Sequence, residues 1–428
     1  MKKPLLLFLI SLISLTTYAQ DLKQIIDQKA DEIEEQVIEW RRHFHENPEL
    51  SNREFETAAY IAGYLNELGL EVETEVAHTG VVAILEGGKP GPVIGLRADI
   101  DGLPVTERTD VPFKSIATGM YQGEEVGVMH ACGHDTHIAI MMGVAKILTE
   151  MKDEIKGTVK FIFQPAEEGA PQGEEGGAEL MVKEGVLENP DVDAIFGLHI
   201  WDSEPVGSIG YRSEGIMASV NSFSLEITGK QAHGSAPWAG IDPIVTAAQI
   251  INNAQTIVSR SMPLTKQAAV VTFGKIEGGV RHNIIPESVS MEGTIRALDE
   301  DMRQLIFKRL EAIVQNTAES NGAAAELTIN KGYPITYNDP ELTAMMAPTL
   351  NEVTNGNANI MDAVTGAEDF SFFQEKIPGL YFFLGGKSPD VESGGHHTPD
   401  FFVDESAMKL GVRAMSNLVV DYMNSAGN

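Results

Sequence analysis

The sequence predicts an α/β protein in which helices flank a central, mostly parallel sheet, and in which a smaller α+β domain is inserted. Two observations support this fold class. Over the first half of the chain, short apolar runs of strand length alternate with helical patterns, which is typical of a parallel sheet covered on both faces. After about Gly215 the order of elements changes, and the first pattern returns only near Pro340.

The first part of the chain begins with two amphipathic helices, because apolar residues recur at helical spacing over residues 27–42 and 54–68. An apolar helix is expected over residues 137–151, with Asp135 as its N-cap. The other elements expected before Gly215 are strands at residues 80–85, 92–98, 158–164 and 194–199 and a helix at 178–184.

The segment after Gly215 has the order β-α-β-β-α-β, which is the ferredoxin-like arrangement. Its predicted strands are residues 222–228, 269–274, 289–296 and 325–330, and its helices are 243–258 and 299–317. A helix at 340–353, a strand at 380–384 and a helix at 405–423 then resume the first pattern. We therefore expect a main domain of residues 20–215 and 332–428, interrupted by an inserted domain of residues 216–331.

Composition excludes two classes of partner. The chain has 428 residues and a formal net charge of −31. Nucleic acids and anionic membranes both require basic patches, so neither is an expected partner. Cys132 is the one cysteine, so no internal disulfide can form.

The first residues resemble an export signal. Lys2 and Lys3 precede an apolar run at residues 5–15, and small side chains before Gln20 suit cleavage after Ala19. The run is shorter than the roughly 20 residues that span a membrane. The sequence therefore predicts residues 1–19 as a signal peptide and a periplasmic or secreted mature protein.

Four segments carry side chains that suit metal ions. Cys132 and His134 lie in a loop before a helix, and Glu167–Glu168 follows an apolar strand. His199 ends another strand, and His396–His397 lies in a glycine-flanked loop. Each segment alone also fits a simpler structural role, such as a buried thiol, a solvated turn or a hydrogen-bonded core histidine. Together, side chains of this kind at strand ends and helix starts predict two divalent ions, with Mn, Zn, Co and Ni all suited to the ligands.

With these segments the chain resembles the amidohydrolase branch of the aminoacylase and carboxypeptidase G metallopeptidases, which includes hippurate hydrolases and indole-acetyl-amino acid hydrolases. The resemblance covers roughly residues 40–404. Its matching blocks are residues 96–104, 129–137, 164–169, 197–201, 229–233, 282–286, 366–370 and 397–399. It implies a phosphorylase/hydrolase-like catalytic domain and an inserted lid domain that commonly mediates dimerisation.

The resemblance also implies roles for individual residues. It assigns two divalent ions to Cys132, His134, Glu168, His199 and His397, with Cys132 as the bridging thiolate. Glu167 is implied as the catalytic carboxylate, and the lid residue His233 as the donor to the oxyanion, from its own or a partner subunit. The alternative is that His233 is a surface-loop histidine, and the functional role is the favoured one.

Four further residues are candidates for supporting roles. Asp99 is expected to orient ligands, and Asp101 either does the same or forms a turn with Gly102. Asn283 and Arg296 are candidates for binding a substrate carboxylate, although Arg296 could instead pair with acidic residues of the lid.

The implied activity is hydrolysis of the amide bond of N-acyl amino acids to a carboxylic acid and a free amino acid. One alternative is a dipeptidase or carboxypeptidase of the same superfamily. Those branches carry histidine before the aspartate of the strand-end block and aspartate in place of Cys132 and His199, so Arg97 and Cys132 speak against it. The other alternative is a secreted metal-binding protein without catalysis, which the presence of Glu167 disfavours.

Overall fold

The computed structural model describes the backbone of residues 4–425 and side chains from Leu22 onward, so Lys2 and Lys3 of the expected export signal lie outside it. The chain forms two compact units. Unit 1 contains the residues up to Glu214, Asn338–Met361 and the residues from Phe372 onward; unit 2 contains Gly215–Tyr337 and Asp362–Ser371. The predicted fold class, an α/β domain with a large central sheet and an inserted α+β domain, is confirmed.

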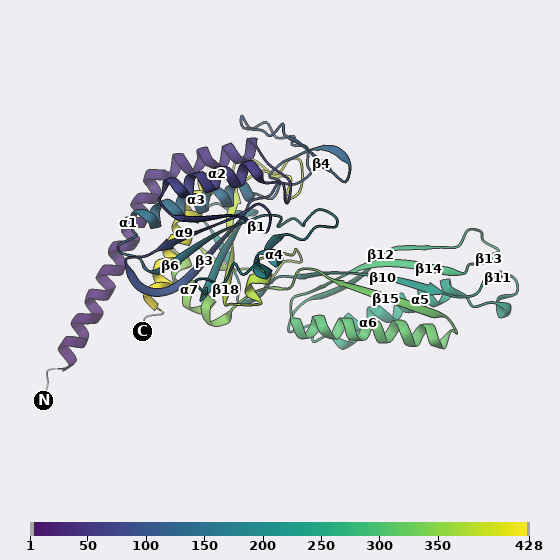
Figure 1. Cartoon of the computed structure of the whole chain (residues 1–428). Helices are drawn as coiled ribbons and strands as arrows, with labels where there is room; N and C mark the ends of the chain where they lie inside the picture. Colours follow the sequence, from purple (N-terminus) through teal and green to yellow (C-terminus); the bar gives the residue numbers. More distant parts are fainter. Residues whose placement is uncertain (1–3, 426–428) are drawn as a thin grey trace. The chain divides into compact units, whose positions relative to one another are not determined.

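The central sheet of unit 1 has eight strands in the order β1-β2-β6-β3-β7-β18-β8-β17. Figure 1 labels β1, β3, β6 and β18 of this sheet. The strands β6, β3, β7 and β18 run parallel to one another, whereas β1 and β2 pair antiparallel with their neighbours. The strand β8 is antiparallel to β18 and parallel to β17. The bounds are β1 Glu71–Val76, β2 Gly80–Glu86, β3 Lys89–Asp99, β6 Lys156–Gln164, β7 Ala194–Pro205, β8 Ile209–Tyr211, β17 Ala358–Ile360 and β18 Gly379–Lys387.

Helices cover both faces of this sheet. Along β6, Val159, Phe161 and Phe163 belong to one large apolar core with residues of α1, α3 and α9. Lys160 points to the other face, where its ammonium donates hydrogen bonds to three carbonyls that follow α4. The helices are α1 Pro4–Glu46, α2 Phe55–Glu67, α3 His134–Glu150, α4 Gly177–Lys183, α7 Pro340–Val353 and α9 Met408–Ser425, with the short α8 Ser371–Gln374 and η3 Glu405–Ala407.

Strand register brings polar residues to one edge of the sheet. Asp99 at the end of β3 pairs with Gln164 at the end of β6, and Arg97 pairs with Gly197 on β7. His199 lies two residues beyond Gly197. Because these strands are parallel, the segments that follow them meet at the same carboxyl edge, where open α/β sheets bind ligands.

Unit 2 is built on a four-stranded antiparallel sheet in the order β12-β14-β10-β15, with α5 and α6 packed against it. Phe223, Leu225 and Ile227 alternate inward along β10, and the residues between them are exposed. The bounds are β10 Ser219–Thr228, α5 Pro243–Thr256, β12 Ala269–Gly278, β14 Ser288–Ala297, α6 Glu300–Ser320 and β15 Ala324–Lys331. This is the predicted ferredoxin-like order.

Smaller elements complete the chain. A ribbon of β11 Ala232–His233 and β13 Ile284–Ile285 lies in unit 2, which also has the single turns η1 Pro237–Ala239 and η2 Ile257–Ser261. A hairpin of β4 Thr118–Tyr121 and β5 Glu124–Gly127 lies in unit 1, and β9 Glu214–Met217 pairs with β16 Thr336–Asn338. Among the helices that the structure describes, none has a stretch both long and apolar enough to cross a membrane.

One predicted boundary is wrong for a reason that matters to the site. The helix expected from residue 137 begins at His134, and its N-cap is Gly133 rather than Asp135. Asp135 lies in the first turn, fully buried, where its carboxylate pairs with Arg41 at 2.7 Å and His45 at 2.8 Å. The Asp135 carboxylate therefore belongs to a buried ion-pair network and does not cap the helix.

Candidate metal centre

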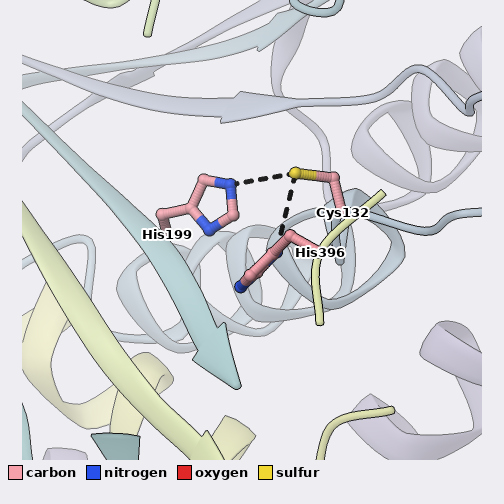
Figure 2. Close-up of side chains that lie close together, drawn as sticks. All are labelled: Cys132, His199 and His396. Carbon is pink, nitrogen blue, oxygen red and sulfur yellow. Dashed lines mark hydrogen bonds between the residues drawn. The ribbon is translucent and has the colours of Figure 1, made fainter. Parts of the chain in front are cut away.

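Cys132, His199 and the pair His396–His397 meet at the carboxyl edge of the sheet in unit 1. Figure 2 shows the Cys132 thiol between the imidazoles of His199 and His396. Its Sγ lies 3.2 Å from Nε2 of His397, 3.4 Å from Nε2 of His199 and 3.7 Å from Nδ1 of His396. One sulfur thus has imidazole nitrogens from two distant chain segments within reach of a shared cation.

Glu168 and His134 extend this cluster. Oε1 of Glu168 lies 3.1 Å from Nε2 of His397 and 3.9 Å from Nε2 of His134. Ligand atoms of Cys132, His134 and Glu168 all lie within 4.8 Å of one another, as do those of Cys132, His199 and His396. The structure therefore brings together in unit 1 all five residues that the resemblance implies as ligands.

The atoms that face one another in this cluster suit a cation. Nε2 of His134 is buried and makes no hydrogen bond within the described chain, and Oε1 of Glu168 lies 3.9 Å from it with the His397 imidazole on its other side. A buried polar atom without a partner is costly, and a divalent ion between the two atoms would satisfy Nε2 of His134 and balance the charge of Glu168. Sulfur, imidazole and carboxylate donors are the set that Zn and similar transition ions prefer.

The charges around the cluster also indicate a cation site. Burial and the carboxylates of Glu168 and Glu167 raise the pKa of the Cys132 thiol well above its usual value. Burial alone would lower the pKa of His134, but Asp99 and Asp101 outweigh it and raise that pKa to about 10. A site that favours protons so strongly carries excess negative potential, which bound cations would neutralise while they hold Cys132 as a thiolate.

Asp101 orients both His134 and the loop that carries the two glutamates. Nδ1 of His134 lies 3.2 Å from Oδ1 of Asp101 and 2.9 Å from its carbonyl oxygen. The two oxygens of Asp101 also accept hydrogen bonds from the backbone N–H groups of Glu167 (3.1 Å) and Glu168 (3.0 Å). Of the two roles considered for Asp101, the geometry supports ligand orientation.

Asp99 is not one of the five implied ligands but contacts residues next to them. Its carboxylate contacts Nδ1 of His137 at 2.5 Å and the guanidinium of Arg97 at 2.6 Å, and it lies 3.8 Å from Nε2 of His134. Arg97 is fully buried and lowers the pKa of Asp99 against the effect of burial. Nε2 of His137 accepts a hydrogen bond from the N–H of Ile200, so both ring nitrogens of His137 are already engaged.

His396 and His397 differ in their surroundings. His397 contacts both Cys132 and Glu168, and hydrogen bonding to Glu168 raises its pKa. His396 points its other nitrogen toward Asp202, with Nε2 at 3.5 Å from the carboxylate, and burial lowers its pKa to about 4. The contact with Glu168 favours His397 as the ligand, although His396 is close enough to Cys132 to take part.

The residues predicted in the inserted domain all lie in unit 2. His233 is exposed on β11, and its Nδ1 accepts a hydrogen bond from the Ser235 N–H. Asn283 is its neighbour across the ribbon, because Gly234 N donates to Asn283 O at 2.8 Å. The side-chain Oδ1 of Asn283 is buried without a hydrogen-bond partner, and Arg296 lies half-buried on β14. No ion pair involves Arg296 among the described residues, so it is not held by acidic residues of the lid.

Fold and ligand cluster together describe a metal-dependent hydrolase, and comparison with known proteins gives its family. The model of peptidase family M20/M25/M40 matches residues 95–421. The chain therefore belongs to this family, whose peptidases are dinuclear metal enzymes that act on amide bonds.

Relatives of known name cover nearly the whole chain. Thermostable carboxypeptidase 2 of Saccharolobus solfataricus is 41% identical over 94% of this chain and 100% of its own length. N-acetyl-L-cysteine deacetylase of Bacillus subtilis is 38% identical over 88% of this chain and 85% of its own. IAA-amino acid hydrolase ILR1-like 2 of Arabidopsis thaliana is 36% identical over 98% and 94%. These relatives confirm the amidohydrolase branch that the sequence motifs indicate.

A solved structure with substantial sequence identity also matches this chain. A Bacillus subtilis protein described as a dinuclear metal binding peptidase from the M20 family superposes with a TM-score of 0.78. It is 35% identical, and the match covers 92% of this chain and 99% of that chain.

The prediction of export is wrong. The carboxypeptidase and deacetylase relatives align over most of the chain, and beside them the N-terminus shows no clear signal peptide. In the structure, α1 runs from Pro4 to Glu46 without a break at the expected cleavage point between Ala19 and Gln20. An apolar run after two lysines is a weak signal by itself, because the start of a long helix can carry the same pattern.

Proposed function

We propose that this hydrolase cleaves the amide bond of N-acyl amino acids and releases a carboxylic acid and a free amino acid. The observation that carries the proposal is the pairing of Glu167 with the ligand cluster. Oε2 of Glu167 lies 3.8 Å from Nε2 of His134, and the next residue, Glu168, faces His397. Neighbouring carboxylates can thus divide the work, one holding metal and the other moving a proton.

Cys132, His134, Glu168, His199 and His397 would hold two divalent ions. When bound, these ions would lower the pKa of an attacking water and polarise the amide carbonyl. Glu167 takes the proton that the attacking water loses and then delivers it to the nitrogen of the leaving amine. The side chain of Glu167 is buried but reachable, with 8% of its surface exposed, as such a shuttle requires.

Three further residues have proposed roles in catalysis and substrate binding. His233 donates a hydrogen bond to the oxyanion that forms as water adds. Asn283 and Arg296 bind the carboxylate of the amino-acid half, for which the planar fork of Arg296 is suited. The side-chain NH₂ group of Asn283 and the guanidinium of Arg296 are the donors that a carboxylate requires, and the half-buried Arg296 makes no ion pair among the residues that the structure describes.

The test is a comparison of wild type with E167Q and E168Q. The E167Q protein should keep its bound metal while its turnover falls by roughly a thousandfold or more, because it keeps the ligands and loses the proton carrier. The E168Q protein should lose metal as well as activity. Wild-type turnover by E167Q would refute the role of Glu167.

The substrate class is tested by a panel of N-acetyl amino acids, hippurate and dipeptides. We expect turnover of acyl amino acids and little turnover of dipeptides with a free amino group. The carboxypeptidase relative at 41% identity supports the second candidate, a peptidase that removes C-terminal residues. Faster cleavage of unblocked dipeptides than of acyl amino acids would favour that candidate.

We also propose that unit 2 mediates a homodimer and that His233 acts across it. The expected mass in light scattering is twice that of the chain. A mixture of inactive E167Q and inactive H233A proteins should then regain activity in hybrid dimers, whereas a monomer or a dimer with self-contained sites would regain none.

A further inference from the structure

We propose that Glu54, a residue outside the ligand cluster, is a positioning residue that fixes the backbone of the loop carrying Glu167 and Glu168. This inference rests on the proposed function for its catalytic consequence. Its effect on the metal site follows from the structure alone.

Glu54 is fully buried just before α2, and both of its carboxylate oxygens are used. Oε1 accepts a hydrogen bond from the backbone N–H of Ala166 at 2.9 Å. Oε2 accepts one from the hydroxyl of Thr79 at 2.6 Å. Although Glu54 precedes the helix, its side chain makes no hydrogen bond that caps it. The carboxylate is therefore directed at the glutamate loop and not at its own helix.

Ala166 is the residue that most needs such a contact. Its φ is +52°, in the left-handed region that residues with a Cβ rarely adopt. A residue in this conformation persists only where its surroundings enforce it. Ala166 directly precedes Glu167, so the direction in which both glutamate side chains leave the backbone depends on this one strained residue.

Two buried carboxylates share the task along three consecutive residues. Glu54 holds the N–H of Ala166, and Asp101 holds those of Glu167 and Glu168. Ser51, three residues before Glu54, donates its hydroxyl hydrogen to Oδ2 of Asp101 at 2.7 Å. The chain from Ser51 to Glu54 thus supports the whole turn, and removal of Glu54 would leave its first N–H buried and unpaired.

A neutral Glu54 side chain can make both contacts. Burial and the nearby charge of Asp101 raise the pKa of Glu54 to about 8. A glutamine has the same shape as the protonated acid, with one oxygen to accept from Ala166 and one NH₂ group to donate to the Thr79 hydroxyl. An aspartate keeps the charge but is one methylene shorter and cannot reach both partners.

The experiment compares E54A, E54D and E54Q with wild type and with T79V, which removes the other partner of Glu54 and leaves the Ala166 contact. Zn²⁺ alone is titrated into each metal-free protein by calorimetry. We expect E54A and E54D to bind Zn²⁺ about 10–100-fold more weakly than wild type, as is usual when groups that orient ligands are removed. The E54Q and T79V proteins should bind within about threefold of wild type.

Activity at saturating metal is the second measurement. For E54A and E54D, kcat should fall by about 10–100-fold while KM changes less than threefold, because the displaced group is the proton carrier and not the substrate pocket. Wild-type Zn²⁺ affinity in E54A and E54D, with only a lower Tm, would overturn the proposal, as would an E54Q protein no better than E54D. If E54A does not fold, the contrast of E54D with E54Q decides.

The two hypotheses fail separately. If wild type hydrolyses no amide in the panel, the proposed function fails, and the Zn²⁺ titrations still decide the role of Glu54. If wild type is active and the Glu54 variants match it in both measurements, only the positioning role fails.

Discussion

Replacement of Gly133 by alanine should damage the metal centre more than its small size suggests. Gly133 lies between Cys132 and His134 with φ of +95°, and a Cβ at this position would lie 2.3 Å from Cγ2 of Ile200. The left-handed backbone costs an alanine roughly 1–2 kcal/mol, and overpacking adds about 1–3 kcal/mol. We expect a loss of about 2–5 kcal/mol in the free energy of unfolding.

Gly123 offers a matched control, because its φ is +85° and no atom lies within 4 Å of a Cβ added there. G123A should therefore show only the backbone cost of roughly 1–2 kcal/mol. Thermal unfolding of both metal-free variants measures the difference, at roughly 1–2 °C in Tm for each kcal/mol in a chain of this size.

Metal binding gives the second measurement on the same pair. The backbone of G133A must move away from Ile200, and the move displaces the two ligands that flank it. Zn²⁺ affinity should fall at least tenfold in G133A and stay at the wild-type value in G123A. Equal Tm values for G133A and G123A, together with equal Zn²⁺ affinities, would refute the reasoning.

Three other changes have expected outcomes. Removal of metal by a chelator should lower the Tm, and added Zn²⁺ should restore it in a concentration-dependent way, by about 2.7 kcal/mol at 100 times Kd; an unchanged Tm would mean that no ion binds the folded state. H45Q should lower the Tm of the metal-free protein most below pH 6.5 and progressively less as pH rises. Burial and Arg41 would lower the pKa of His45, but its contacts with Asp135 and Glu107 raise it, so its stabilising charge is lost above that raised pKa; a difference independent of pH contradicts this. R97M should cost about 3–5 kcal/mol, because it removes the guanidinium partner of the buried Asp99 charge and leaves that charge beside His137; a Tm within a degree of wild type argues against that ion pair.

Much of the fold could be predicted because its signals are local. The central strands are continuous apolar runs, since they are buried on both faces, and the strands of unit 2 alternate as half-buried strands do. The edge strand β1 was missed, because its sequence from Glu71 to Val76 is dense in charge and its residues are largely exposed. Its identity depends on pairing with β2 and not on its own composition.

The ligand types of the centre could be predicted from sequence, whereas their supports could not. Cys132, His134 and Glu168 are chemically distinctive, and strand ends in an α/β sheet converge. Glu54 and Ser51 look like ordinary residues before a helix, and only the fold places them beside Ala166 and Asp101. Asp135 is a case in which a predicted role was wrong. The sequence indicates an N-cap at Asp135, whereas in the structure its carboxylate pairs with Arg41.

The histidines of the metal centre differ in solvent exposure, so a chemical reagent can modify one of them before the others. The side chain of His397 is 54% exposed, whereas His134 is fully buried and His199 is 4% exposed. A reagent that acylates neutral imidazoles, such as diethyl pyrocarbonate, will thus reach His397 long before the other two. Because Glu168 raises the pKa of His397, this labelling will slow as the solution becomes more acidic. Because a metal ion bound to His397 would protect it from the reagent, mass spectrometry of the labelled peptide reports metal binding at His397 without any substrate.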